Sequence, residues 1–458
     1  MFFEYLIAVL IVAVYLWLIV FAIRGGNMTI GFLLAGCMWT AVVLVGFKGG
    51  LLSPDFAAAN ADLVAKPVMS FLMQLFQDGI RGQGGLVIDI VFGAWFGAVL
   101  METGIAATLV RKTVELGGDK PVLVAVLLSL IVSGMFTSIF GIGAVIGIGV
   151  IVFPILLSLG IPKVTAATSY LFSVAAGLYM NPTLGIGTFN TYTVDAAGNP
   201  LYTFKEYAGA FGWIAMILST VYVAGMTWWT VRKTTAVKSW AAPVDDLAAP
   251  PAQKVPGIAL LLPFMPTITI LAFKTENIPT FLLWGFVALF VCGRGKSVKM
   301  LGDNYSKTLY TGIVDSASLI AFLIMLAMVT KSIGSAQPFI ALLLQPIIPQ
   351  NQPLIIAIVV AVLAPAALFR GPLTMFGTAG PIYLILASFG YPHSFLFPLF
   401  WVPSITINVA ACVTQSYVAW GISYAKIDTK EWLKYAVPKA WILSAALSMV
   451  AYFVCGMY

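Results

Sequence analysis

The chain contains 458 residues, of which 61% are hydrophobic and 9% are charged, and its formal net charge is +7. Soluble domains carry about 25% charged residues, so this composition excludes a soluble globular protein and predicts an all-α polytopic membrane protein. The basic residues lie in short loops between apolar runs, where they set the orientation of the spans. The positive charge therefore does not indicate nucleic-acid binding.

The first apolar runs, at about residues 3–48, predict two scaffold helices, because a membrane span takes about 20 apolar residues. The first run has neither a basic start nor an Ala-x-Ala cleavage site, which favours a retained helix over a signal peptide. Further spans are expected over about residues 86–109, 208–231, 312–330 and 437–457. We expect a multi-pass protein of the inner (cytoplasmic) membrane, and the basic loops place the N-terminus outside.

Two apolar runs between about residues 121 and 159 meet at a short junction rich in hydroxyls and glycine. Such breaks expose backbone groups that lipid cannot satisfy, so they persist only against protein, water or a bound solute. The pattern predicts a re-entrant helical hairpin with its tip near the bilayer midplane. Two ordinary spans joined by a tight loop give the same topology and are the alternative. The candidate ligands at this tip are Ser133, Thr137 and Ser138.

The next run, at about residues 163–189, contains Asn181-Pro182-Thr183. Proline lacks an N–H and disfavours helix at the preceding residue, so this helix is predicted to break at Asn181. A broken helix offers N–H groups at a positive dipole end to an anion, and carbonyls to a cation. Asn181 and Thr183 are therefore candidate binding residues, although a Thr within a span more often bonds to its own helix.

An Ala- and Pro-rich segment at residues 232–255 begins with basic residues and predicts a cytoplasmic linker between two halves, 1–231 and 256–458. The last spans of the two halves are predicted to run in opposite directions. The halves then form an inverted repeat, with the scaffold helices of the second half at about residues 256–293. Four residue pairs lie 230 residues apart: Gly104/Gly334, Gly141/Gly371, Gly160/Gly390 and Pro162/Pro392. About two Gly–Gly coincidences are expected at any one offset, so the number of pairs decides little. Their order supports the repeat more, because a Gly-x-Pro turn follows the glycine of each polar break after 19 residues.

A lone arginine, Arg370, interrupts the apolar sequence of the second half between Pro353–Leu368 and Leu373–Phe389. A guanidinium cannot lose its proton, so within a membrane it must face water, protein or an anion. Its position predicts the tip of a second hairpin, at about residues 352–389, and a pathway for a negatively charged solute. The alternative is an arginine at a helix end that reaches the membrane interface. Thr374 lies beside it as a further candidate.

The run at about residues 393–420 has a second polar break and predicts a second broken helix, with Asn408, Thr414 and Gln415 as candidates. Two hairpin tips and two broken helices would converge on one site near the midplane. The Asn181 and Asn408 breaks are also possible sodium sites. No other metal site is indicated, because the four cysteines fall singly within apolar runs.

Three carboxylates in or near the spans, Asp89, Glu102 and Asp315, are candidates for ion coupling. A solvated carboxylate at the membrane boundary is the alternative for each of them.

The motifs of both halves resemble the ion-transporter superfamily, most closely the anaerobic C4-dicarboxylate carriers and next the gluconate permeases. The resemblance rests on Phe140-Gly141-Ile142-Gly143, Phe153-Pro154, Gly160-Ile161-Pro162, Asn181-Pro182-Thr183 and Leu262-Pro263-Phe264-Met265-Pro266. It implies a homodimer in which a transport domain slides, elevator-fashion, past a scaffold and carries organic anions with sodium or protons. The second tip, Phe369-Arg370-Gly371-Pro372, departs from the Gly-Ser-Gly-Asn type of run in those carriers.

These features predict a secondary active transporter of a small organic anion, a mono- or dicarboxylate of C4-dicarboxylate or gluconate type. We expect alternating access with proton or sodium coupling and no cofactor. The alternative is a small-anion channel. No phosphate-binding Walker sequence or zinc-type His-Glu-x-x-His motif occurs, and no nucleophile–base pair is evident, so an enzyme is not expected.

Overall fold

The computed structural model describes residues 2–24, 26–81, 84–118, 120–194, 199–233, 255–344, 346, 351–377 and 379–457. Within these ranges the chain consists of helices, turns and one isolated β-bridge between Val194 and Pro200. The all-α prediction is therefore confirmed. Most of the predicted linker at 232–255 lies outside the described residues.

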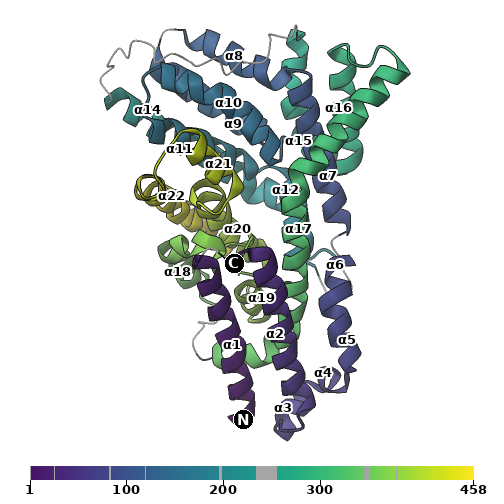
Figure 1. Ribbon diagram of the computed structural model, residues 1–458. Coiled ribbons are helices and arrows are strands. Elements are labelled where there is room, and N and C mark those ends of the chain that lie inside the picture. The colour runs from purple at the N-terminus through teal and green to yellow at the C-terminus, as the bar shows by residue number, and fades with distance from the viewer. Residues whose placement is uncertain are drawn as a thin grey trace.

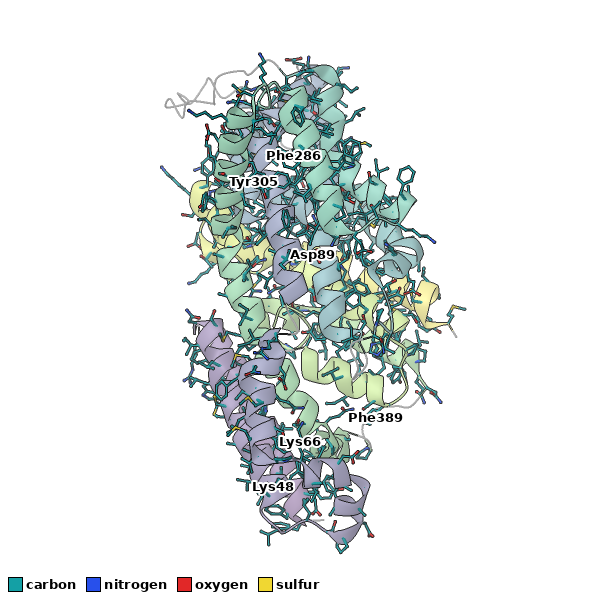
Figure 2. All side chains as sticks on the ribbon, turned by 90° about the vertical axis from the view of Figure 1, so that its right-hand side faces the viewer. Lys48, Lys66, Asp89, Phe286, Tyr305 and Phe389 are labelled. Atoms are coloured by element: carbon teal, nitrogen blue, oxygen red, sulfur yellow. The ribbon has the colours of Figure 1, made fainter. Side chains whose placement is uncertain are left out.

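Two helices, α1 (Phe2–Ile23) and α2 (Met28–Lys48), lie side by side at the end of the molecule that holds the N-terminus (Figure 1). Figure 2 shows Lys48 and Lys66 near this end, and Phe286 and Tyr305 toward the opposite one. Short helices then lead to α7 (Gly84–Glu102): α3 (Pro54–Ala59), α4 (Ala61–Ala65), α5 (Val68–Met73), η1 (Gln74–Asp78) and α6 (Gly79–Arg81).

The span expected over residues 86–109 is not one straight helix, because the chain bends by 59° between α7 and α8 (Ile105–Gly117). The bend lies at Gly104, whose φ of +73° is a left-handed conformation that glycine adopts without strain. The buried residues of α8 recur at helical spacing, including Ile105, Leu109 and Val110, so α8 packs one apolar face against the core.

The second half begins with η3 (Gly257–Phe264), α15 (Met265–Phe273) and α16 (Asn277–Val291), and continues into α17 (Val298–Leu344). The span expected at 312–330 is only the middle of α17, whose 47 residues extend over about 70 Å at 1.5 Å per residue. Its first half packs on α7, where a Cβ at Gly312 would meet the backbone of Trp95. Its second half packs on α2, where Thr40 donates a hydrogen bond to Ser332.

Each half contains a hairpin, a broken helix and a final long helix. The first half has α9 (Pro121–Met135) and α10 (Ile142–Ser158), then α11 (Lys163–Leu178) and α12 (Pro182–Tyr192), then α13 (Phe204–Tyr207), η2 (Ala208–Gly212) and α14 (Trp213–Lys233). The second half has α18 (Pro353–Leu363), η4 (Ala364–Arg370) and α19 (Gly380–Ser388), then α20 (His393–Pro403), η5 (Ser404–Val409) and α21 (Ser416–Tyr424), then α22 (Thr429–Ala451) and η6 (Tyr452–Gly456).

The two hairpins end in the same way. Gly160 and Gly390 have left-handed φ values of +76° and +91°, and Pro162 and Pro392 are the N-caps of α11 and α20. The two other pairs of glycines that lie 230 residues apart, Gly104/Gly334 and Gly141/Gly371, differ in backbone conformation. Gly334 is helical where Gly104 bends the chain, and Gly371 is extended where Gly141 has a φ of +107°.

Five described helices are long and apolar enough to cross a membrane, or six with the bent α7–α8 pair. They are Phe2–Phe21, Thr29–Lys48, Phe204–Arg232, Pro353–Arg370 and Thr429–Gly456. By contrast, α9 has 15 residues and α19 has 9, about 22 and 14 Å at 1.5 Å per residue. Because the hydrocarbon core is about 30 Å thick, these arms are too short to cross it, which favours re-entrant hairpins over pairs of full spans.

Candidate functional site

The hairpin tips and the broken helices meet around a cavity of about 270 Å³. Six segments from both halves of the chain line it: the two tips, the two helix breaks, and one turn each of α2 and α17. The lining residues are Thr29, Phe140, Gly141, Ile142, Leu178, Leu184, Asp315, Ser316, Arg370, Phe376, Val409, Thr414, Gln415, Ser416 and Tyr417. Segments of all four predicted breaks thus contribute to the lining of this one cavity.

Arg370 lies at the tip of the second hairpin and lines this cavity. Its Nη2 donates to Gln415 Oε1 at 3.0 Å and its Nη1 donates to the Phe376 carbonyl at 3.2 Å. These two contacts are to neutral groups, and they hold the guanidinium at the tip of the hairpin. Phe369 and Arg370 have φ values of +54° and +63°. A left-handed backbone costs about 1–2 kcal/mol per L-residue, and such strain is typical of functional sites.

Two helix N-termini add positive potential to the same cavity. The helix α10 begins at Ile142, directly after Gly141, and α21 begins at Ser416, directly after Gln415. The first N–H groups of a helix have no intrahelical partner and form the positive end of the helix dipole. Together with the guanidinium, these two ends make the cavity receptive to an anion.

The rest of the lining is partly polar and partly apolar, and the volume limits the solute. A volume of about 270 Å³ is close to the lower end of the usual range for small-molecule sites, about 300–1,000 Å³. A cavity of mixed lining with a few convergent polar groups is typical of a small-molecule site. The apolar lining residues are Phe140, Ile142, Leu178, Leu184, Phe376 and Val409.

Of the candidates taken from the sequence, the structure brings Arg370, Thr414, Gln415 and Asp315 together in this cavity. Thr414 also contacts the Cys412 thiol, with 3.0 Å between Oγ1 and Sγ.

Two candidate asparagines lie outside the cavity lining and tie each broken helix to the hairpin of its own half. Asn181 donates to the carbonyls of Phe136 and Ile139, both at 2.9 Å, and accepts from Leu184 N at 3.2 Å. Asn408 donates to the carbonyl of Ala367 at 3.4 Å. Its Oδ1 atom is buried and has no hydrogen-bond partner among the described residues. The two halves thus use the same type of contact, and the sodium sites suggested at these breaks stay predictions.

The hydroxyls of the first hairpin are likewise used within the protein. Ser133 donates to the Ser129 carbonyl and Thr137 to the Gly134 carbonyl. Ser138 lies 2.8 Å from Thr267 Oγ1, which joins the hairpin tip to α15. This hairpin therefore contributes Phe140, Gly141 and Ile142 to the cavity lining, rather than the predicted hydroxyl residues.

The other candidate threonines also lie outside the lining set. Thr374 Oγ1 accepts from Phe376 N at 3.3 Å and so shapes the second tip. That tip is held on both sides, because Met375 N donates to Ser404 Oγ and Tyr192 OH donates to the Met375 carbonyl. Thr183 is buried against Gly93, where a Cβ would collide with its hydroxyl.

The three candidate carboxylates have different surroundings. Asp89 lies about halfway along the molecule in Figure 2 and faces Asn277 at the start of α16. Glu102 forms a salt bridge with Lys307, with 2.8 Å between Oε1 and Nζ. Asp315 lines the main cavity. Within the described part of the chain, no three His, Cys, Asp or Glu side chains gather closely enough to hold a metal ion.

Sequence reasoning missed the polar lining residues Thr29, Ser316, Ser416 and Tyr417. Ser416 and Tyr417 directly follow the predicted Thr414–Gln415 break, so a break extended by one helical turn would have included them. Thr29 and Ser316 lie in other helices, and only the tertiary packing brings them to the cavity.

Neither a protein-family model nor a curated protein sequence matches the chain. Among solved structures, the chain is similar to the YdaH transporter of Alcanivorax borkumensis, whose crystal structure is described as revealing an unusual topology. The TM-score is 0.58 at 14% sequence identity, and the match covers 93% of this chain and 99% of that one. The chain therefore shares its overall fold with that protein over nearly its whole length.

Proposed function

We propose that this protein is a secondary transporter of a small organic anion that carries a carboxylate. One observation supports this most directly: the Arg370 guanidinium and the N-termini of α10 and α21 line the same cavity at the meeting point of both hairpins. Arginine presents paired N–H donors that match a carboxylate, and helix N-termini favour negative charge. The transporter fold agrees with this reading.

A carboxylate in the cavity would accept from Arg370 and from the first N–H groups of α10 or α21. Gln415 would keep the guanidinium in place, and the apolar walls would contact the carbon skeleton of the solute. Mono- and dicarboxylates of the C4-dicarboxylate or gluconate type suit a cavity of about 270 Å³.

For the mechanism we propose alternating access in a homodimer, in which the hairpin-bearing bundle moves, elevator-fashion, past α1, α2, α15 and α16, driven by protons or sodium. Broken helices and re-entrant hairpins built around a central site suit such a movement. The Ser138–Thr267 contact must break during that movement if α15 belongs to the scaffold. The inner membrane is the proposed location, with the N-terminus outside.

A thermal-shift assay on the purified full-length protein tests anion binding. Acetate, succinate and gluconate are the probes, and neutral succinamide is the control. A bound ligand raises the unfolding temperature. We expect at least one carboxylate, and not succinamide, to stabilise the protein. Arg370→Ala should weaken binding by at least about tenfold, because a hydrogen bond to a charged group contributes about 1.5–3 kcal/mol. Arg81→Ala, at an exposed arginine of α6, is the matched control.

Counterflow in proteoliposomes then separates a carrier from a channel. An internal pool of the bound carboxylate should accelerate uptake of the labelled one. Anion conductance without such trans-stimulation would favour the channel instead. Equal affinity of the wild type and Arg370→Ala would remove Arg370 from the site.

A further inference from the structure

We infer that Asp315 carries the coupling proton, at the point where the anion cavity meets a second cavity that leads to the Glu102–Lys307 salt bridge. This inference rests on the proposed function and adds the coupling ion and its residue.

The second cavity has a volume of about 340 Å³ and lies between α7, α10 and α17. Asp315 is the residue that its lining shares with that of the anion cavity, within the described part of the chain. Glu102 lines this cavity, and the side chain of its partner Lys307 is 62% exposed, so their salt bridge lies between the cavity and the molecular surface. Its lining residues are Ala98, Met101, Glu102, Gly143, Ala144, Thr308, Thr311 and Asp315.

The Asp315 carboxylate is placed between the two cavities by α10. Its Oδ2 atom packs over Gly143, in the first turn of that helix. In the described part of the chain, no lysine or arginine forms a salt bridge with it. A half-buried carboxylate in such a place is costly unless it binds a proton or another cation.

The charged and titratable groups around Asp315 favour coupling between anion and proton. Those that line its two cavities are Glu102 from α7, Arg370 from η4 and Tyr417 from α21. The helix α10 carries no titratable residue along Ile142–Ser158. Protonation of Asp315 removes a negative charge from the cavity that receives the anion. Anion binding and protonation therefore strengthen each other by the same factor, which is the requirement for symport.

The lining favours a proton over a sodium ion. The second cavity offers few side-chain oxygens besides the carboxylates, namely the hydroxyls of Thr308 and Thr311, which donate to the carbonyls of Asn304 and Lys307. Thr308 also accepts from Trp95 Nε1. A hard cation requires several oxygen ligands, whereas a proton requires only the carboxylate.

The test uses the full-length protein in proteoliposomes, with labelled succinate as the probe. The wild type should exchange succinate, and should accumulate it under a proton gradient that is acidic outside but not under a sodium gradient. Asp315→Asn should still exchange succinate, but it should lose the proton-driven accumulation. The pH dependence of its exchange, at least about fivefold in the wild type, should also be lost. Asp303→Asn, at an exposed aspartate of α17, is the matched control and should behave as the wild type.

The outcomes separate the inference from the function on which it rests. No exchange of any carboxylate by the wild type would refute the proposed transport, and the inference with it. Exchange with accumulation driven by sodium alone, or by neither gradient, would overturn only the proton assignment. Unchanged proton-driven accumulation by Asp315→Asn would overturn the role of Asp315. If Asp315→Asn fails to fold, Asp315→Glu is measured instead. It keeps a titratable carboxylate but displaces it, so the pH dependence of exchange should shift, and a pH dependence identical to that of the wild type would contradict the inference.

Discussion

The Asp315 carboxylate occupies the space that a side chain at residue 143 would need, because a Cβ built on Gly143 would collide with Asp315 Oδ2. The glycine therefore lets the carboxylate lie against the first turn of α10, between the two cavities. A methyl group here would displace the carboxylate without changing its chemistry.

Gly143→Ala should impair coupling more than exchange. We expect proton-driven accumulation of succinate to fall at least about fivefold, and exchange to change less than about twofold. The reason is that the methyl group alters the coupling free energy between the proton site at Asp315 and the anion site, but removes no group that binds the anion. The measurement is the ratio of accumulation to counterflow in the same proteoliposomes. Gly147→Ala is the matched control: it adds the same methyl group one turn along α10, against the flexible end of Met101. Equal losses of both activities in Gly143→Ala would indicate damage to the anion cavity instead.

Arg370→Lys should bind carboxylates more weakly although it keeps the positive charge. Lysine cannot form the paired N–H bonds of a guanidinium, nor donate simultaneously to Gln415 and Phe376 in the same geometry. We expect a loss of at least about tenfold in affinity, from about 1.4 kcal/mol or more of binding energy. Titration of the bound carboxylate by calorimetry would measure it. An unchanged affinity would show that charge alone accounts for binding.

Asn181→Ala should destabilise the protein more than it alters anion binding. The substitution removes the partners of two buried carbonyls and of one helix N–H. Each unsatisfied buried group costs about 1–3 kcal/mol, so a total loss of roughly 3 kcal/mol or more is expected. The change should appear as a lower temperature of unfolding in the absence of ligand. Asn408→Ala should cost less, because its one described side-chain bond is the 3.4 Å contact to Ala367. A larger loss for Asn408→Ala would contradict this assignment.

The positions of the breaks could be predicted where glycine or proline clusters with polar residues inside an apolar run. Arg370 and the Thr414–Gln415 break accordingly line the cavity as expected. The partners of hydroxyls and amides could not be predicted in the same way. Ser133 and Thr137 bond to carbonyls of their own segment, and only the packing of α15 determines that Ser138 meets Thr267.

Helix lengths and bends were predicted less well, since they depend on contacts rather than on hydropathy. An apolar run does not show that Gly104 turns the chain while Gly334 continues a helix. In α17, the contacts of Gly312 with α7 and of Ser332 with α2 support one helix across the predicted boundary at residue 330.

The contact between Ser138 and Thr267 allows the proposed movement to be tested by cross-linking. Their hydroxyl oxygens are 2.8 Å apart, so cysteines at both positions should lie within reach of a disulfide. If the hairpin slides past α15, oxidation of Ser138→Cys/Thr267→Cys should abolish succinate counterflow, and reduction should restore it. Each single cysteine variant, treated in the same way, is the control. Counterflow that continues in the cross-linked protein would show that α15 moves with the hairpin, and the scaffold would then have to be assigned without it.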